Sequence, residues 1–116
     1  MKKKYEVDLS AQYTVEFPDE QKVIDYFIDG TWKESFFEFS DIEDMVSSII
    51  YSFIRTDTQL SSDTTQAAFW YKEIEGYPPF IRDKDDRDLF VASHEECGTI
   101  IVKLEDELEV GYVTEK

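Results

Sequence analysis

The stretch KYEVDLSAQYTVEF, residues 4–17, alternates between apolar and polar side chains along its whole length. A period of two is typical of a β-strand that buries one face and leaves the other in water, as in antiparallel sheets. One face carries Tyr5, Val7, Leu9, Ala11, Tyr13, Val15 and Phe17. The other carries Glu6, Asp8, Ser10, Gln12, Thr14 and Glu16, with three acids and no base. We therefore predict a long N-terminal strand with an acidic outward face.

The segment after this strand predicts a helix and a second strand. Pro18 ends the first strand, because proline cannot donate a hydrogen bond to a neighbouring strand. Residues 19–29 show helical apolar spacing with acids at the start, and Gly30 is the predicted C-terminal cap. Residues 31–39 are rich in aromatic side chains, so we expect a second strand that folds back beside the first.

A strong helical pattern follows Ser40. Ser40 and Glu43 have the spacing of a capping box, in which each side chain bonds to the backbone N–H of the other residue. Apolar residues then recur at every third or fourth position: Ile42, Met45, Val46, Ile49, Ile50, Phe53 and Ile54. We expect this segment to be the main core helix, packed across the sheet.

The rest of the chain predicts mostly strands. We expect a polar loop over 56–65, an aromatic strand over 66–75 ended by Gly76 and Pro78, an exposed charged segment over 81–88 and a short strand over 88–92. Residues 99–104 and 108–114 should form a hairpin around the all-acid loop 105–107. The predicted fold is α+β, with an antiparallel sheet of about four to six strands and two helices packed on one face. The expected order is β-α-β-α-β-β-β.

The composition favours one soluble, intracellular domain over residues 1–116. At 41% hydrophobic and 16% aromatic, the 116 residues can form a core without disulfides or a structural metal. The single cysteine, Cys97, cannot form an internal disulfide, which fits a reducing cytosol. The basic start at residues 1–4 is followed by Tyr-Glu-Val-Asp instead of the apolar run of a signal peptide. No apolar stretch approaches the roughly 20 residues that cross a bilayer, so we expect a cytoplasmic protein.

The charge of the chain is strongly negative. It has 27 acidic and 12 basic residues, a formal net charge of −15. Residues 5–54 alone contain twelve acids and two bases. This charge argues against direct binding to nucleic acid or to an anionic membrane, because both repel it. A net charge of about 2 to 8 is enough for solubility, so the excess favours a basic partner.

Residues able to carry catalysis or hold a metal are few. His94 and Cys97 are the only imidazole and thiol, and the acids between them would raise the pKa of the thiol. None of the four glycines lies in a phosphate-binding motif. Residues 83–88 resemble the start of a calcium loop, but Asp88 and His94 stand where an EF-hand needs glycine and glutamate. We therefore expect no enzyme activity, no metal and no cofactor.

Acids on the predicted outward surfaces are the candidate partner-binding residues. They are Glu6, Asp8 and Glu16 on the first strand, Asp25 and Asp29 on the first helix, and Glu34 and Glu38 on the second strand. On a strand such residues are spaced by multiples of about 6.6 Å. Rows of carboxylates can occupy a basic groove and compete with nucleic acid, which binds largely through its phosphates.

In size and charge the chain resembles the small acidic inhibitors that phages encode against restriction or CRISPR nucleases, some of which mimic DNA. Three hypotheses remain open. The protein is an inhibitor that blocks a positively charged nucleic-acid-binding protein or nuclease complex. Alternatively, it is an immunity-type or accessory protein that binds a basic partner around aromatic anchors such as Trp32, Trp70 or Tyr77. In the third hypothesis it is an accessory domain whose acidity serves only solubility.

Overall fold

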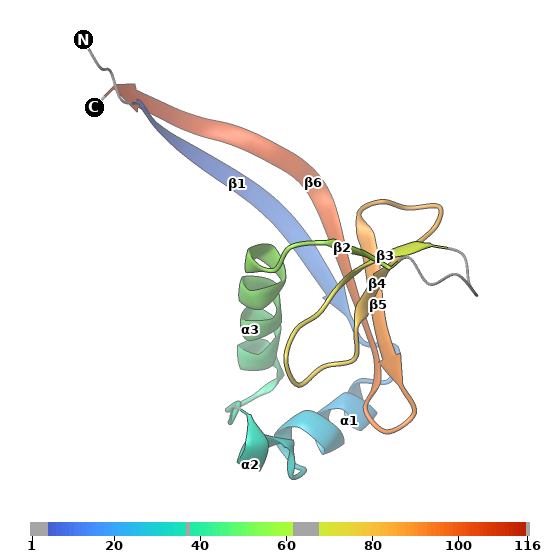
Figure 1. The fold of residues 1–116 in the computed structure, drawn as a ribbon. Helices are drawn as coiled ribbons and strands as arrows, with labels where there is room; N and C mark the ends of the chain where they lie inside the picture. The colour runs from blue at the N-terminus through green and yellow to red at the C-terminus, as the bar shows by residue number, and fades with distance from the viewer. Residues whose placement is uncertain (1–4, 37, 62–67, 116) are drawn as a thin grey trace.

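The protein forms a six-stranded antiparallel sheet with helices packed against it (Figure 1). The computed structural model describes residues 5–36, 38–61 and 68–115, and within these ranges it describes side chains from Ala11 to Glu105 except Lys33 and Ser35. The strand order is β1-β6-β5-β4-β3-β2. The elements are β1 (Tyr5–Glu16), α1 (Glu20–Val23), the π-helical turn η1 (Ile24–Ile28), α2 (Trp32–Ser35), α3 (Ile42–Arg55), β2 (Gln59–Ser61), β3 (Phe69–Lys72), β4 (Phe80–Arg82), β5 (Leu89–His94) and β6 (Gly98–Glu115). The predicted α+β class is confirmed.

The predicted N-terminal strand is confirmed as β1, but its partner was predicted wrongly. β1 pairs with β6 near the C-terminus, from Tyr5 opposite Glu115 to Glu16 opposite Ile101. No strand forms in the described part of 31–39. There, Trp32 begins α2 and buries its indole, whose Nε1 donates to the Gly76 carbonyl at 2.8 Å. Trp32 and Phe39 of this segment are buried in the core, and β6 takes the place beside β1.

The first predicted helix is confirmed, with a different end. Asp19 accepts a hydrogen bond from the Lys22 N–H and caps α1. The helix then widens into η1, where the Asp29 N–H donates to the Ile24 carbonyl at 2.9 Å. Gly30 does not have the left-handed conformation expected of a glycine cap. A Cβ there would lie 2.7 Å from the Tyr26 carbonyl oxygen, so close backbone approach explains this glycine.

The main core helix is confirmed as α3, with its cap displaced by one residue. Asp41, not Ser40, is the N-cap, and its carboxylate accepts from the Asp44 N–H at 2.8 Å. The helix buries Met45, Ile49 and Phe53. At its other end, the ammonium of Lys72 on β3 donates to the Phe53 carbonyl at 2.8 Å. This bond satisfies a carbonyl of the last helical turn, which has no helical donor.

The core lies between the helices and one face of the sheet. Residues that face each other across β5 and β6 are buried together, with Phe90 opposite Val102 and Ala92 opposite Ile100. Phe53 of α3 meets this face edge-on, 5.0 Å from the Phe90 ring centroid. The helical segment α1–η1 adds further side chains to the same core cluster, namely Val23 and Phe27. The helices therefore cover one face of the sheet, as predicted.

Two predicted loops are strands. Gln59–Ser61, inside the predicted loop 56–65, forms β2, and Phe80–Arg82, at the start of the predicted charged segment 81–88, forms β4. Residues 62–65 lie outside the described residues. The strand predicted over 66–75 is confirmed as the shorter β3, and the one over 88–92 as β5. Short strands of three or four residues are hard to recognise because they hold barely one period of alternation.

The predicted C-terminal hairpin is wrong, because β6 is one continuous strand of 18 residues. The pairing with β1 shifts three times, between Asp8 and Leu9, between Ser10 and Gln12, and between Gln12 and Tyr13. At each shift β6 holds one more residue than β1, which is the pattern of a β-bulge. The acidic run Glu105–Glu107 lies among these bulges instead of at a turn.

β1 and β6 continue past the rest of the sheet as a two-stranded ribbon that ends beside both termini (Figure 1). β5 pairs with β6 only up to Lys103, so the ribbon has no third strand beyond that point. The radius of gyration is 17.1 Å. A compact domain of this length would have a radius of gyration of about 13 Å. The ribbon therefore makes the molecule elongated.

Candidate functional site

The structure divides the seven predicted acids between two regions. Glu6 and Asp8 lie in the first half of β1, opposite Thr114 and Tyr112 of β6. The structure does not describe their side chains. Glu16 is exposed at the end of β1, opposite Ile101. All three residues therefore lie on the strand predicted for them, β1.

The other four predicted acids lie in the helical region. Asp25 and Asp29 are exposed around η1, and Asp25 accepts a hydrogen bond from the Gln21 side chain at 2.8 Å. Glu34 is on α2, and Glu38 lies in the segment before α3; both are exposed. The second strand that was predicted to place Glu34 and Glu38 beside β1 does not form in the described residues of 31–39. The predicted row of carboxylates on two neighbouring strands is therefore wrong for these two residues.

β6, the strand that pairs with β1, contains further acids. We call residues 5–13 of β1 and 104–115 of β6 the acidic ribbon. It contains seven acids and no lysine or arginine: Glu6, Asp8, Glu105, Asp106, Glu107, Glu109 and Glu115. Lysines at positions 2–4 and 116 lie outside the described residues. Three of these acids, Glu105, Asp106 and Glu107, were missed because residues 105–107 were assigned to a turn. The absence of glycine from 105–107 was the signal against that turn.

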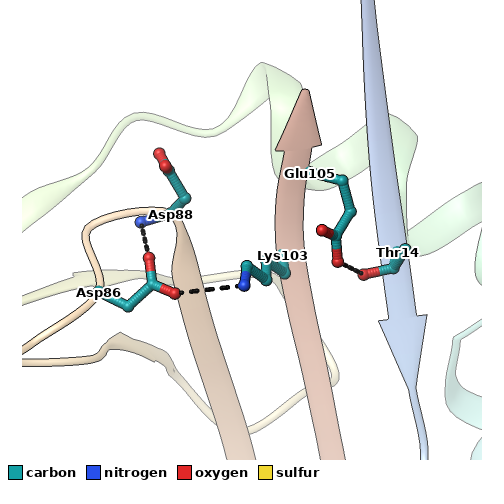
Figure 2. A network of polar contacts seen from close by, with 5 residues as sticks. All are labelled: Thr14, Asp86, Asp88, Lys103 and Glu105. Atoms are coloured by element: carbon teal, nitrogen blue, oxygen red, sulfur yellow. Dashed lines mark hydrogen bonds and ion pairs between the residues drawn. The ribbon is translucent and has the colours of Figure 1, made fainter. Parts of the chain in front are cut away.

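Polar contacts fix the side chains at the root of the ribbon (Figure 2). Thr14 on β1 donates to Glu105 on β6 at 2.9 Å, which ties the two strands together across the pair. Lys103 forms an ion pair with Asp86 at 3.6 Å, and Asp86 also accepts from the Asp88 N–H at 3.0 Å. Lys103, the residue that precedes the ribbon on β6, is therefore already paired with Asp86.

His94 and Cys97 do not form a nucleophilic pair. The Glu96 N–H donates to His94 Nδ1 at 3.1 Å, so this nitrogen acts as an acceptor. Cys97 is only 2% exposed, and its thiol lies 3.5 Å from the Gly98 carbonyl oxygen. Burial raises the pKa of the Cys97 thiol. A protonated, enclosed thiol is a poor nucleophile, because the thiolate is the reactive form.

This burial gives a direct prediction for Cys97. In the native protein the thiol should react with a disulfide reagent such as dithionitrobenzoate at least about 10-fold more slowly than in the denatured protein at the same pH. The rate is read from the released chromophore, with the chain in guanidinium chloride as the control. Equal rates in the two states would show that the thiol is accessible and reactive in the folded protein.

Metal ligands are not assembled in the part of the chain that the structure describes. No group of three or more His, Cys, Asp or Glu side chains there is placed to hold a metal ion. Asp86, the centre of the calcium-like segment, instead pairs with Lys103. The Asp86 carboxylate thus has a structural role in this loop.

The three proposed aromatic anchors differ in exposure. Trp32 is 6% exposed and stacks on Phe39, with ring centroids 5.4 Å apart. Tyr77 stacks on Phe27 in the same core region, at 5.1 Å. Trp70 is 40% exposed, with the Arg82 guanidinium 5.1 Å from its ring centroid. Of the three residues, Trp70 alone presents a large surface to a partner.

Comparisons with known proteins add no relative. Protein-family models, curated proteins and solved structures were all searched, and no match to this chain was found. Among the described residues, no helix combines the length and apolar character needed to cross a membrane. Functional inference therefore depends on the geometry and charge of the molecule itself.

Proposed function

We propose that this protein is a small acidic inhibitor that blocks a positively charged nucleic-acid-binding protein or nuclease complex. The acidic ribbon is the observation that carries the proposal. It projects from the body of the molecule, where a groove can enclose it, and its sequence holds seven acids and no base. The inhibitor would act in the cytoplasm, where such enzymes meet nucleic acid, and it needs no catalytic residue or cofactor.

The charge density of the ribbon supports competition with nucleic acid. The nine β1 residues are separated by eight steps of about 3.4 Å, which gives a ribbon of about 27 Å, or one acid per roughly 4 Å. A single DNA strand carries one phosphate per roughly 3.4 Å of helix axis. Lysine and arginine side chains spaced for a nucleic-acid strand could therefore pair with successive carboxylates of the ribbon. Such pairing does not depend on the base sequence of the nucleic acid that the ribbon displaces.

The immunity-type alternative is supported less well. It requires an aromatic anchor at the centre of the interface. Trp32 and Tyr77 belong to the core region, so among the proposed anchors only Trp70 could serve. A loss of most affinity on Trp70→Ala alone would favour this alternative over the ribbon.

The proposal is tested by neutralising acids in two regions. The ribbon variant carries Glu6→Gln, Asp8→Asn, Glu105→Gln, Asp106→Asn and Glu107→Gln. The control variant carries Asp25→Asn, Asp29→Asn, Glu34→Gln, Glu38→Gln and Glu43→Gln, which change the net charge by the same amount. Partners are captured from cell extract at about 0.15 M salt and released at about 0.5 M, where surface charges are more strongly screened. A released nucleic-acid-binding protein is then purified for affinity measurement with and without a DNA duplex.

We expect the ribbon variant to bind roughly 50- to 100-fold more weakly. This estimate takes about 0.5 kcal/mol for each of the exposed ion pairs that are lost. The control variant should change the affinity by less than about 5-fold, since its acids lie outside the ribbon. DNA should compete with the wild-type protein for the partner. A partner that DNA does not displace, or a larger loss from the control than from the ribbon variant, would contradict the proposal.

A further inference from the structure

The face of the sheet that the helices leave open carries an apolar stripe. Strand register places Tyr71, Ile81, Val91 and Ile101 side by side across β3, β4, β5 and β6. These residues alternate with the core residues of the same strands, so they lie on the opposite face from Phe80, Phe90 and Val102. Four neighbouring strands make a stripe about 14 Å long.

The stripe is partly exposed, and a hollow lies beside it. Ile81 is 43% exposed, and Val91 and Ile101 are half-buried. A shallow hollow of about 530 Å³ adjoins the stripe, and its apolar lining includes Phe69, Pro79 and Leu89. The charged residues that line the same hollow are Arg82, Asp83 and Lys84, two bases and one acid. A contiguous apolar patch on the surface of a soluble domain commonly marks an interaction site.

Acids border the stripe on the side of the ribbon. The next residue in the same cross-strand row is Glu16, opposite Ile101, and it is exposed. Thr14 and Glu105 follow on the same face, joined by their hydrogen bond (Figure 2). Lys103 also lies on this face, but Asp86 neutralises it. The open face is therefore apolar in the middle and acidic where it meets the ribbon.

We infer that this open face docks the basic partner itself, with apolar side chains on the stripe and lysine or arginine beside Glu16 and Glu105. The inference rests on the proposed function and names the surface that anchors the complex. Charge decides against a second copy as the occupant, because two chains of net charge −15 would repel each other at the acidic border. The anchor supplies buried apolar area, which exposed ion pairs of the ribbon cannot provide.

The inference is tested with synthetic amphipathic helical peptides that need no knowledge of the partner. Two peptides of the same length carry leucine on one face and either lysine or glutamate on the other. Fluorescence anisotropy measures their affinity for the wild-type protein and for Ile81→Thr with Val91→Thr, which keeps β-branched side chains on both strands. Ile54→Thr on α3, where Ile54 is 56% exposed, is the matched control away from the stripe.

We expect the lysine peptide to bind at least about 10-fold more tightly than the glutamate peptide, and the double variant to weaken it about 10-fold. The Ile54 control should change binding less than about 2-fold. Glu16→Gln with Glu105→Gln should reduce the salt dependence of binding. If thermal unfolding shows that the double variant is not folded, Ile81→Thr alone is used, with an expected loss of about 3-fold.

Three outcomes would overturn the inference. They are no binding of the lysine peptide to the wild-type protein, unchanged binding to the stripe variants, and dimerisation through this face in sedimentation experiments. None of them depends on competition with DNA. The lysine peptide could bind as expected while DNA fails to displace the captured partner. That result would support the docking face and reject competition with nucleic acid.

Discussion

Replacing Gly76 by alanine should lower the free energy of unfolding by about 3 kcal/mol. Gly76 has φ = +91°, a backbone conformation that costs an alanine roughly 1–2 kcal/mol. A Cβ at this position would also lie 2.9 Å from Trp32 Cζ2 and 3.1 Å from Phe36 Cδ1. Overpacking of this kind costs about 1–3 kcal/mol, because the buried Trp32 ring cannot move aside. Urea unfolding of both proteins measures the difference.

Gly98 provides the matched control for this prediction. It has φ = +86°, but a Cβ there would lie 3.5 Å from Val23 Cγ2, which is ordinary contact. Gly98→Ala should therefore show the backbone cost alone, about 1–2 kcal/mol. Equal losses at the two glycines would mean that the contact with Trp32 adds nothing. The hydrogen bond from the Trp32 indole to the Gly76 carbonyl would then be the stronger constraint on this turn.

The parts of the fold that the sequence predicts are those with a long, regular pattern. β1 holds six periods of alternation, and α3 holds an apolar stripe over almost four turns, so each pattern outweighs local exceptions. The predicted N-cap of α3 was wrong by one residue, because Ser40 and Asp41 are adjacent and both residue types are good N-caps. Local pattern sufficed for these elements because α3 buries Met45, Ile49 and Phe53, and β1 packs Tyr13 and Val15 against the core.

The errors arose where distant residues decide the structure. Residues 31–39 have the aromatic content of a strand, but Trp32 is held in the core by its hydrogen bond to Gly76, 44 residues away. Residues 105–107 look like an exposed tip, but pairing with β1 at the other end of the chain extends the strand through them. Neither contact leaves a signal in the neighbouring sequence. Tertiary pairing therefore overrode local propensity in both segments.

The candidate site was likewise predicted only where it depends on local sequence. Alternation placed Glu16 on the outward face of β1, where it is exposed. The acids of β6 were missed, since their strand partner could not be identified from local pattern. The apolar stripe was also missed, because it runs across four strands and only one of its residues comes from each strand. A surface built across strands becomes visible only when the register is known.

Replacing Phe53 by alanine should cause the largest loss, about 4 kcal/mol of unfolding free energy. Phe53 is 3% exposed, and its ring meets the rings of Tyr13, Phe80 and Phe90 at centroid distances of 5.0–6.0 Å. These contacts join α3 to β1, β4 and β5. Phenylalanine-to-alanine changes in a core cost about 3–5 kcal/mol, because a cavity remains that the neighbours cannot fill.

Lys72 makes this site still less tolerant of a cavity. Its ammonium lies 4.2 Å from the centroid of the Phe53 ring and donates to the Phe53 carbonyl. Burial lowers the pKa of Lys72, so its charge is already partly desolvated. Removing the ring takes away the cation–π contact, while the partly desolvated charge of Lys72 remains. In urea unfolding, Tyr51→Ala on the exposed side of the same helix should cost less than about 1 kcal/mol. A loss below about 1.5 kcal/mol for Phe53→Ala would mean that α3 is not held to the sheet through this ring.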